Sequence, residues 1–241
     1  MNLKKVTIIA VFLLIAVISF TKISPWASDP ESHNYSIVKT DDKISTVMAL
    51  SGGAAATSAT LSLLPGDFGT PIAEQMAELA KYFLMILSAL YLEKFLITIS
   101  GFITFSVLIP IACILVCVAV VVKRRDLIEI AVKIAIVGFI IFLIVPASVM
   151  ISDMVYDTQA ETVESTLDQY NELDLEKGSD SGLLNEITTI TTDTVDRVSS
   201  FLQGLLESLA VMIVTACAIP IIVFVFLIWL VKTIFGVSPI K

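Results

Sequence analysis

Two long apolar runs, residues 101–122 and 127–150, flank the cationic tripeptide Lys123-Arg124-Arg125. An α-helix rises about 1.5 Å per residue and bilayer hydrocarbon is about 30 Å thick, so either run is long enough to span a membrane. Cations in a short loop mark the cytoplasmic side. The pattern therefore predicts two transmembrane helices joined by a cytoplasmic loop at 123–126.

Composition agrees with a membrane protein, because 56% of the residues are hydrophobic and 16% are charged. Two further apolar runs, 6–23 and 210–231, predict two more spans, and the segment 232–241 is then a cytoplasmic tail. The acidic segments between spans are expected outside the cell, with both termini inside. The residues that determine this topology are Lys4, Lys5, Lys123, Arg124, Arg125 and Lys232.

The first span, within residues 1–25, permits two interpretations. Its cationic start, apolar stretch and small residue at Ala27 are typical of a secretory signal peptide. Pro25 lies three residues before that cleavage position and fits the small-residue pattern poorly. The segment is therefore a retained signal-anchor helix, which gives four spans, or a cleaved signal peptide, which leaves three.

The apolar stretch from Tyr82 to Ile99 resembles a fifth span. Spanning the membrane there would place the charges of Glu93 and Lys94 at lipid depth, at a cost of about 2.5 to 3.5 kcal/mol each. Residues 72–122 are instead predicted to form one long helix, with an external stalk at 72–100 and a span at 101–122. The stretch then becomes the buried face of an external bundle.

A second external segment, 151–209, predicts the rest of this bundle. Apolar residues at alternating spacings of four and three follow two helices, with a turn at 178–182 between them, which indicates an antiparallel hairpin. Residues 26–71 are expected to be irregular or to form short helices. The predicted fold is all-α: a multi-pass membrane protein whose long helices continue into an external antiparallel bundle.

Pro110 and Pro220 are the candidate hinge or gate residues, because proline removes a backbone hydrogen bond and bends a helix. They end a weak internal repeat, in which 94–111 and 204–221 both close with Ile-Pro-Ile. The repeat indicates either a duplication or a chance match of apolar sequences. Glu129 and Lys133 lie four residues apart and either pair with each other or form a cytoplasmic ring of pore charges.

The sequence offers little for catalysis. It has one histidine, and it lacks a phosphate-binding glycine loop, an HExxH motif and a nucleophile elbow. Cys113 and Cys117 lie in an apolar run, where cysteine usually packs as a small hydrophobe. We expect no enzymatic activity, no cofactor, no metal and no binding of nucleic acid.

Two functional classes remain. In the first, copies self-associate into a pore or channel with an acidic external vestibule. In the second, the protein is a non-conducting envelope scaffold or sensor whose external bundle docks a partner protein. The plan of four spans and internal termini is similar in topology to connexins and calcium-homeostasis modulators, but their external cysteines are missing here. In either class the expected location is the plasma membrane, with the bilayer as a partner.

Overall fold

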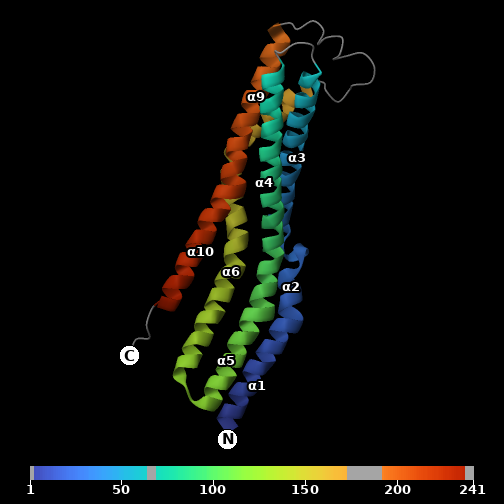
Figure 1. Ribbon diagram of the computed structural model, residues 1–241. Helices are drawn as coiled ribbons and strands as arrows, with labels where there is room; N and C mark the ends of the chain where they lie inside the picture. Colours follow the sequence, from blue (N-terminus) through green and yellow to red (C-terminus); the bar gives the residue numbers. More distant parts are fainter. Residues whose placement is uncertain (1–2, 64–68, 173–191, 237–241) are drawn as a thin grey trace. The chain divides into compact units, whose positions relative to one another are not determined.

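The computed structural model describes residues 3–63, 69–172 and 192–236, and every regular element in these ranges is helical, as the sequence predicts (Figure 1). The symbol η marks 3-10 and π helices. In chain order the elements are α1 (Leu3–Ile18), η1 (Ser19–Ile23), α2 (Ser24–Ser28), η2 (Pro30–His33), α3 (Asn34–Ser62), α4 (Thr70–Phe102), η3 (Ile103–Leu108), α5 (Ile109–Val122), α6 (Arg125–Asp157), α7 (Ala160–Glu172), α9 (Thr192–Ile213), η5 (Val214–Ala218) and α10 (Ile219–Gly236).

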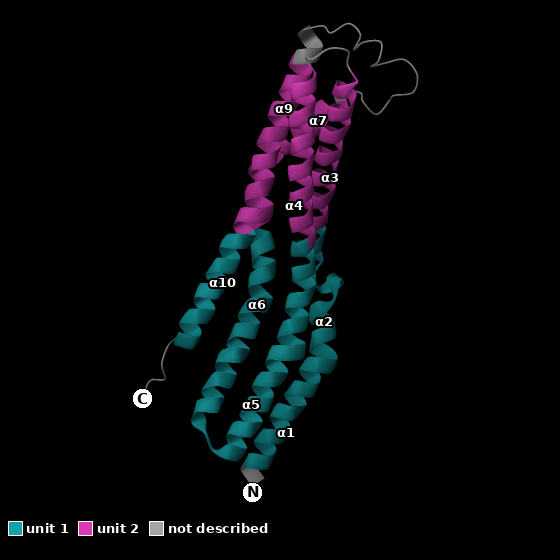
Figure 2. Ribbon diagram, in the orientation of Figure 1, with its two compact units in different colours: residues 1–39, 92–150, 220–241 teal, residues 40–91, 151–219 magenta. Residues whose placement is uncertain are grey.

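The chain divides into two compact units (Figure 2). Unit 1 comprises Met1–Lys39, Leu92–Met150 and Pro220–Lys241, and unit 2 comprises Thr40–Tyr91 and Ile151–Ile219. The sequence of unit 1 has 11 basic and 5 acidic residues, a formal charge of +6, and that of unit 2 has 4 basic and 18 acidic residues, a formal charge of −14. The division by contacts is thus also a division by charge.

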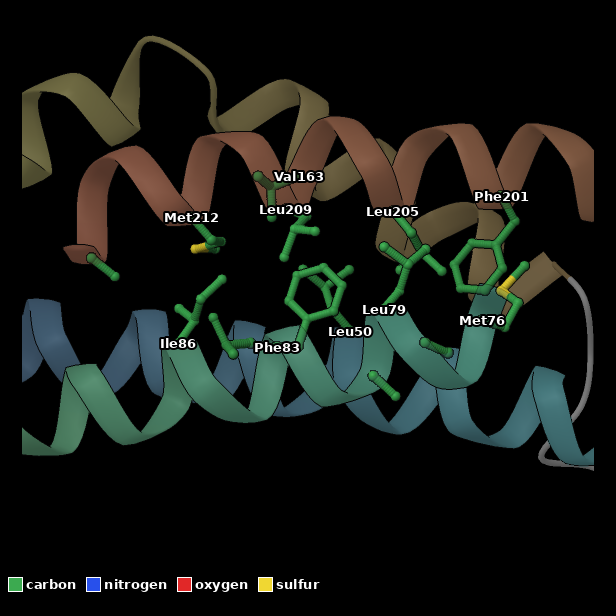
Figure 3. Close-up of a cluster of buried hydrophobic side chains, with 14 of the residues drawn as sticks. Leu50, Met76, Leu79, Phe83, Ile86, Val163, Phe201, Leu205, Leu209 and Met212 are labelled. Carbon is green, nitrogen blue, oxygen red and sulfur yellow. The ribbon is translucent and has the colours of Figure 1, made fainter. Parts of the chain in front are cut away.

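Unit 2 has an apolar core of the kind found in soluble helical bundles. Phe83 of α4 and Phe201 of α9 are completely buried, together with Leu50 of α3 and Val163 of α7. Figure 3 shows side chains of α3 and α4 facing those of α7 and α9. Four helices therefore contribute to one hydrophobic cluster, which is the main stabilising interaction of this unit.

The expectation of irregular structure or short helices at 26–71 is wrong for most of that segment, since α3 is a single helix of 29 residues. Its run of small residues allows close packing against its neighbours. Ser51 Oγ donates to the Ala80 carbonyl at 3.2 Å, and Ser58 Oγ donates to the Ala73 carbonyl at 2.7 Å. A Cβ added to Gly53 would lie 3.0 Å from the Tyr170 ring. Tertiary contacts thus outweigh the low helix propensity of glycine.

The predicted external hairpin corresponds to α7 and α9, which pack against each other. Ser208 Oγ donates to Thr166 Oγ1 at 2.9 Å, and the rings of Tyr170 and Phe201 stack with centroids 5.9 Å apart. The first arm is not continuous, because α6 ends at Asp157 and a turn precedes α7. The predicted turn at 178–182 lies outside the described residues.

Unit 1 exposes large apolar side chains along its helices. Leu14 of α1, Val121 of α5, Phe139 of α6 and Phe224 of α10 are each more than half exposed. Small residues provide its interior contacts: a Cβ on Gly138 would lie 3.2 Å from that of Leu108. Water does not solvate such a surface favourably, whereas lipid does.

Five helices of the described residues are long and apolar enough to cross a membrane: Lys5–Ser28, Pro30–Ser62, Thr70–Val122, Arg125–Asp157 and Asp196–Gly236. The sequence led us to expect four, or three after cleavage, and the addition is the helix containing α3. It differs from the other four, because 44% of its most apolar 18-residue stretch is buried inside the protein, whereas the corresponding stretches of the others are 6% to 22% buried.

The stretch from Tyr82 to Ile99 is buried on one face only. Phe83 and Leu90 belong to the core of unit 2, as expected, but Met85 and Leu92 are 69% and 58% exposed. Burial of the whole stretch was therefore too broad an expectation. The stretch forms part of α4, which continues through η3 and α5 to Val122.

Candidate functional site

The candidate hinge prolines have the same local structure. A π-helix, η3 or η5, ends two residues before Pro110 or Pro220. The residue before each proline donates its N–H to the carbonyl five residues back: Ile109 to Thr104 and Ile219 to Val214. A proline ring collides with the carbonyl four residues back in a regular α-helix, and a widened turn relieves that collision.

A widened turn has a second consequence. In a π-helix the residue at the proline position would donate to the carbonyl five residues back, but proline has no N–H. That carbonyl belongs to Phe105 before Pro110 and to Thr215 before Pro220. Ser19 Oγ donates to the Phe105 carbonyl at 2.8 Å, and Ser152 Oγ donates to the Thr215 carbonyl at 2.7 Å. At both prolines, a serine from another helix takes the place of the missing N–H.

Pro25 is a third example that sequence reasoning did not select. The π-helix η1 ends at Ile23, and Ser24 donates its N–H to the Ser19 carbonyl. Ser24 Oγ and Ser106 Oγ are 2.6 Å apart, a hydrogen bond that joins α2 to η3 inside unit 1. Pro146, in contrast, lies inside α6 with no π turn. The shared geometry follows from proline chemistry and therefore does not by itself establish a duplication.

The serine at the Pro220 turn also contacts a buried lysine. Lys43 of α3 is 2% exposed, and its Nζ donates to Ser152 Oγ of α6 at 2.9 Å. Figure 1 labels both helices. The same Nζ lies 5.5 Å from the centre of the Tyr156 ring. Asp153, the residue after Ser152, is 3% exposed. We name Lys43, Ser152, Tyr156 and Thr215 the polar cluster of unit 2.

Tyr156 lies half-buried in this cluster. Burial raises the pKa of its phenol above 10.0, and nearby carboxylates, Glu164 among them, raise it further. A hydrogen bond with Thr46 opposes this shift. The phenol is therefore neutral at physiological pH.

Sequence reasoning missed Lys43, which lies in the segment that was hardest to interpret. A detectable signal exists: Lys43 shares a helical face with Thr40, Val47 and Leu50, which are all buried. A lysine on an otherwise inward face indicates a buried charge, and buried charges are rare unless they have polar partners.

The remaining predicted site residues lie in unit 1. Lys133 Nζ is 3.1 Å from Glu129 Oε1, so these two residues pair with each other. Lys123 ends α5 in the left-handed conformation, with φ at 62°, and α6 begins at Arg125. Lys5 Nζ donates to the Val120 carbonyl at 3.3 Å, which brings two of the cationic segments together.

The three remaining predicted residues are cations. Arg124 lies between α5 and α6, and Lys232 is exposed on α10. The side chain of Lys4 lies outside the described residues. Within the described ranges, no three His, Cys, Asp or Glu side chains form a group that could hold a metal ion.

Comparison with known proteins gives no relative from which a function could be inferred. No protein-family model, curated protein or solved structure matches this chain.

Proposed function

We propose that this chain is a membrane-anchored scaffold, in which unit 1 spans the bilayer and unit 2 is an external bundle that docks a partner protein without conducting ions. The contrast between the two units carries the proposal. Unit 1 exposes large apolar side chains, while unit 2 buries an apolar cluster and has a formal charge of −14. Lipid is the medium suited to the first surface and water to the second.

The hydrogen bonds of unit 1 favour a scaffold over a pore. Ser19 Oγ donates to the Phe105 carbonyl, and Thr104 Oγ1 donates to the Gly138 carbonyl at 2.9 Å. Glu129 and Lys133 form an ion pair with each other. A pore assembled from several copies needs polar groups directed toward a shared channel. Here these polar groups have partners within their own chain, and the outward surface is mainly apolar.

The distribution of charge supports the orientation. Cations of unit 1 gather near Lys5 and Lys123, which supports a cytoplasmic location for this end by the positive-inside rule. The C-terminus is then cytoplasmic, and unit 2 lies on the outer side of the plasma membrane. We assign α3 to this outer bundle rather than to a fifth span, because Asp41, Asp42 and Lys43 lie within it.

Charge also indicates the class of partner. An acidic bundle attracts a basic protein surface and repels an acidic one. Exposed carboxylates on α7, including Glu161 and Glu164, are available for such contacts. Docking is therefore expected to weaken as ionic strength rises, because salt screens exposed charges beyond about 10 Å at 0.1 M.

A measurement of ion conduction distinguishes the scaffold hypothesis from the pore hypothesis. The purified full chain is reconstituted into liposomes that hold a potassium gradient and a potential-sensitive dye. Resistance to alkaline carbonate extraction first establishes that the protein is inserted. The scaffold is expected to leave the gradient intact, as empty liposomes do. A potassium flux that scales with protein content would refute the non-conducting function and support the pore.

Orientation is tested separately in intact cells. Cys113, Cys117 and Cys217 are replaced by alanine, and single cysteines are introduced as Gln159→Cys in unit 2 and Arg124→Cys between α5 and α6. An impermeant thiol reagent is expected to label the first variant and to leave the second unlabelled until the cells are opened. The reverse pattern would place unit 2 in the cytoplasm.

A further inference from the structure

Helix α4 has two apolar faces, and the bundle covers one of them. The inner face includes Phe83, Ile86 and Leu90, which belong to the hydrophobic cluster of unit 2. The opposite face is exposed: Met85, Leu92, Phe95 and Phe102 have exposed fractions of 69%, 58%, 58% and 51%. A single helix that is apolar on opposite sides requires a second covering surface.

The exposed face repeats with the spacing of a coiled coil. Its positions alternate by three and four residues, and every member except one serine is apolar. We name this face the outer seam; its members are Met85, Ser88, Leu92, Phe95, Ile99, which is half-buried, and Phe102. Residues at the a and d positions of a heptad have this spacing and pack against a partner helix. The serine is compatible with burial, since Ser88 Oγ donates to the Leu84 carbonyl of its own helix at 3.0 Å.

Lipid cannot cover the outer seam over its whole length. Residues 103–122 provide about 30 Å of helix, which fills the hydrocarbon thickness of a bilayer. The helix from Phe102 to Met85 rises roughly a further 25 Å beyond it. This step rests on the membrane placement proposed above, with Lys123 at the cytoplasmic surface, and it puts the stretch of unit 1 from Leu92 to Phe102 outside the hydrocarbon. Most of the seam then lies where water would meet it.

We propose that the outer seam pairs with the same seam of a second copy of this chain, so that α4 and its counterpart form a parallel two-helix interface. Copies inserted in one membrane share an orientation, which brings identical seam positions together. The seam carries no charge, so it has no electrostatic attraction for a basic partner. Its apolar surface is complementary to an identical seam. A self-complementary apolar face therefore fits a second copy best.

The available area is sufficient for such a pair. Four large side chains of the seam, Met85, Leu92, Phe95 and Phe102, and two beside it, Leu84 and Tyr91, are at least half exposed. At roughly 100 Å² each, six of them would bury about 600 Å² per copy, or about 1,200 Å² in total, at the lower end of stable protein interfaces. Repulsion between two acidic bundles opposes this gain, and salt would reduce the repulsion. The dimer is thus expected to strengthen with ionic strength, opposite to docking of a basic partner.

Disulfide cross-linking tests the seam directly. In the cysteine-free full chain in lipid nanodiscs, Leu92→Cys is compared with Met154→Cys on α6, whose native side chain is 62% exposed. Both variants must react with a thiol reagent, which shows comparable access. Upon mild oxidation, Leu92→Cys is expected to form a covalent dimer and Met154→Cys to remain monomeric. Equal yields, or no dimer at position 92, would overturn the proposal.

A second variant measures affinity without a cross-link. Leu92→Lys places like charges opposite each other at the centre of the interface, and is expected to raise the dimer dissociation constant roughly thirtyfold in detergent sedimentation. Met154→Lys, at an exposed position on α6 outside the seam, is the control and should leave the constant unchanged. A monomeric native chain, or equal effects of both variants, would reject the seam. Carbonate extraction reports insertion independently, so failure of the seam is distinguishable from failure of the scaffold.

Discussion

A double-mutant cycle at Ser152 and Pro220 tests whether the Ser152 hydroxyl takes the place of the backbone N–H that proline lacks. Ser152→Ala removes the 2.7 Å hydrogen bond to the Thr215 carbonyl and the 2.9 Å bond from Lys43 Nζ. A lost neutral bond costs about 1 kcal/mol, an unsatisfied buried carbonyl costs about 1 to 3 kcal/mol, and the bond to a charged donor adds to this. We expect Ser152→Ala to lower the free energy of unfolding by about 3 kcal/mol.

Pro220→Ala supplies the second arm of the cycle. It restores an N–H that can donate to the Thr215 carbonyl or allow a regular α-helical turn. Either outcome gives that carbonyl a backbone partner, so Ser152→Ala should cost at least about 1 kcal/mol less in the Pro220→Ala background than in the native chain. The remaining cost reflects the contact with Lys43.

The assay is denaturant unfolding in mild detergent, followed by far-UV circular dichroism. Thr233→Ala on α10 is a matched control, because Thr233 Oγ1 donates to the Trp229 carbonyl within one helix at 2.9 Å and lies at an exposed position. It should change the free energy of unfolding by less than about 0.5 kcal/mol. Costs of Ser152→Ala that are equal in both backgrounds, within about 0.5 kcal/mol, would refute the explanation.

Two further predictions concern packing and pH. Gly101→Ala places a Cβ against the Ala27 carbonyl oxygen and should destabilise unit 1 by about 3 kcal/mol. In Gly52→Ala the added Cβ meets nothing within 4 Å, so this substitution should stabilise α3 by about 0.5 to 1 kcal/mol. Thermal unfolding of the two variants checks both values. The raised pKa of Tyr156, which lies outside the proposed spans, means that folding favours the neutral phenol. The contribution of the neutral phenol to stability is complete below pH 10 and is lost as pH rises through the folded-state pKa. The free energy of unfolding should therefore fall less steeply above pH 10 in Tyr156→Phe than in the native chain. Identical pH profiles of the two proteins would contradict this.

Sequence periodicity predicted the helical class and the long helix ending at Val122, because apolar spacing and chain length directly reflect helix geometry. It did not predict α3. The glycines and small residues there indicated irregular structure or short helices, since local propensity takes no account of the carbonyls of α4 that Ser51 and Ser58 contact. Close packing between helices separated in sequence decided that segment.

The candidate site divides in the same way. Pro110 and Pro220 were identified from sequence, because the effect of proline on its own helix is local. Ser19 and Ser152 were not, since the carbonyl that each serine contacts belongs to a residue far away in the chain. Lys43 was missed for the same reason, as its burial depends on helices beyond its own.

The sequence by itself determined the helical class, the apolar lengths that suit a bilayer and the segregation of cations from carboxylates, because these depend on residue order along single helices. Only the tertiary structure decided which face of α4 is buried and which serine replaces each proline N–H. Those outcomes depend on contacts between distant segments, and one apolar sequence is compatible with many such arrangements until the helices pack.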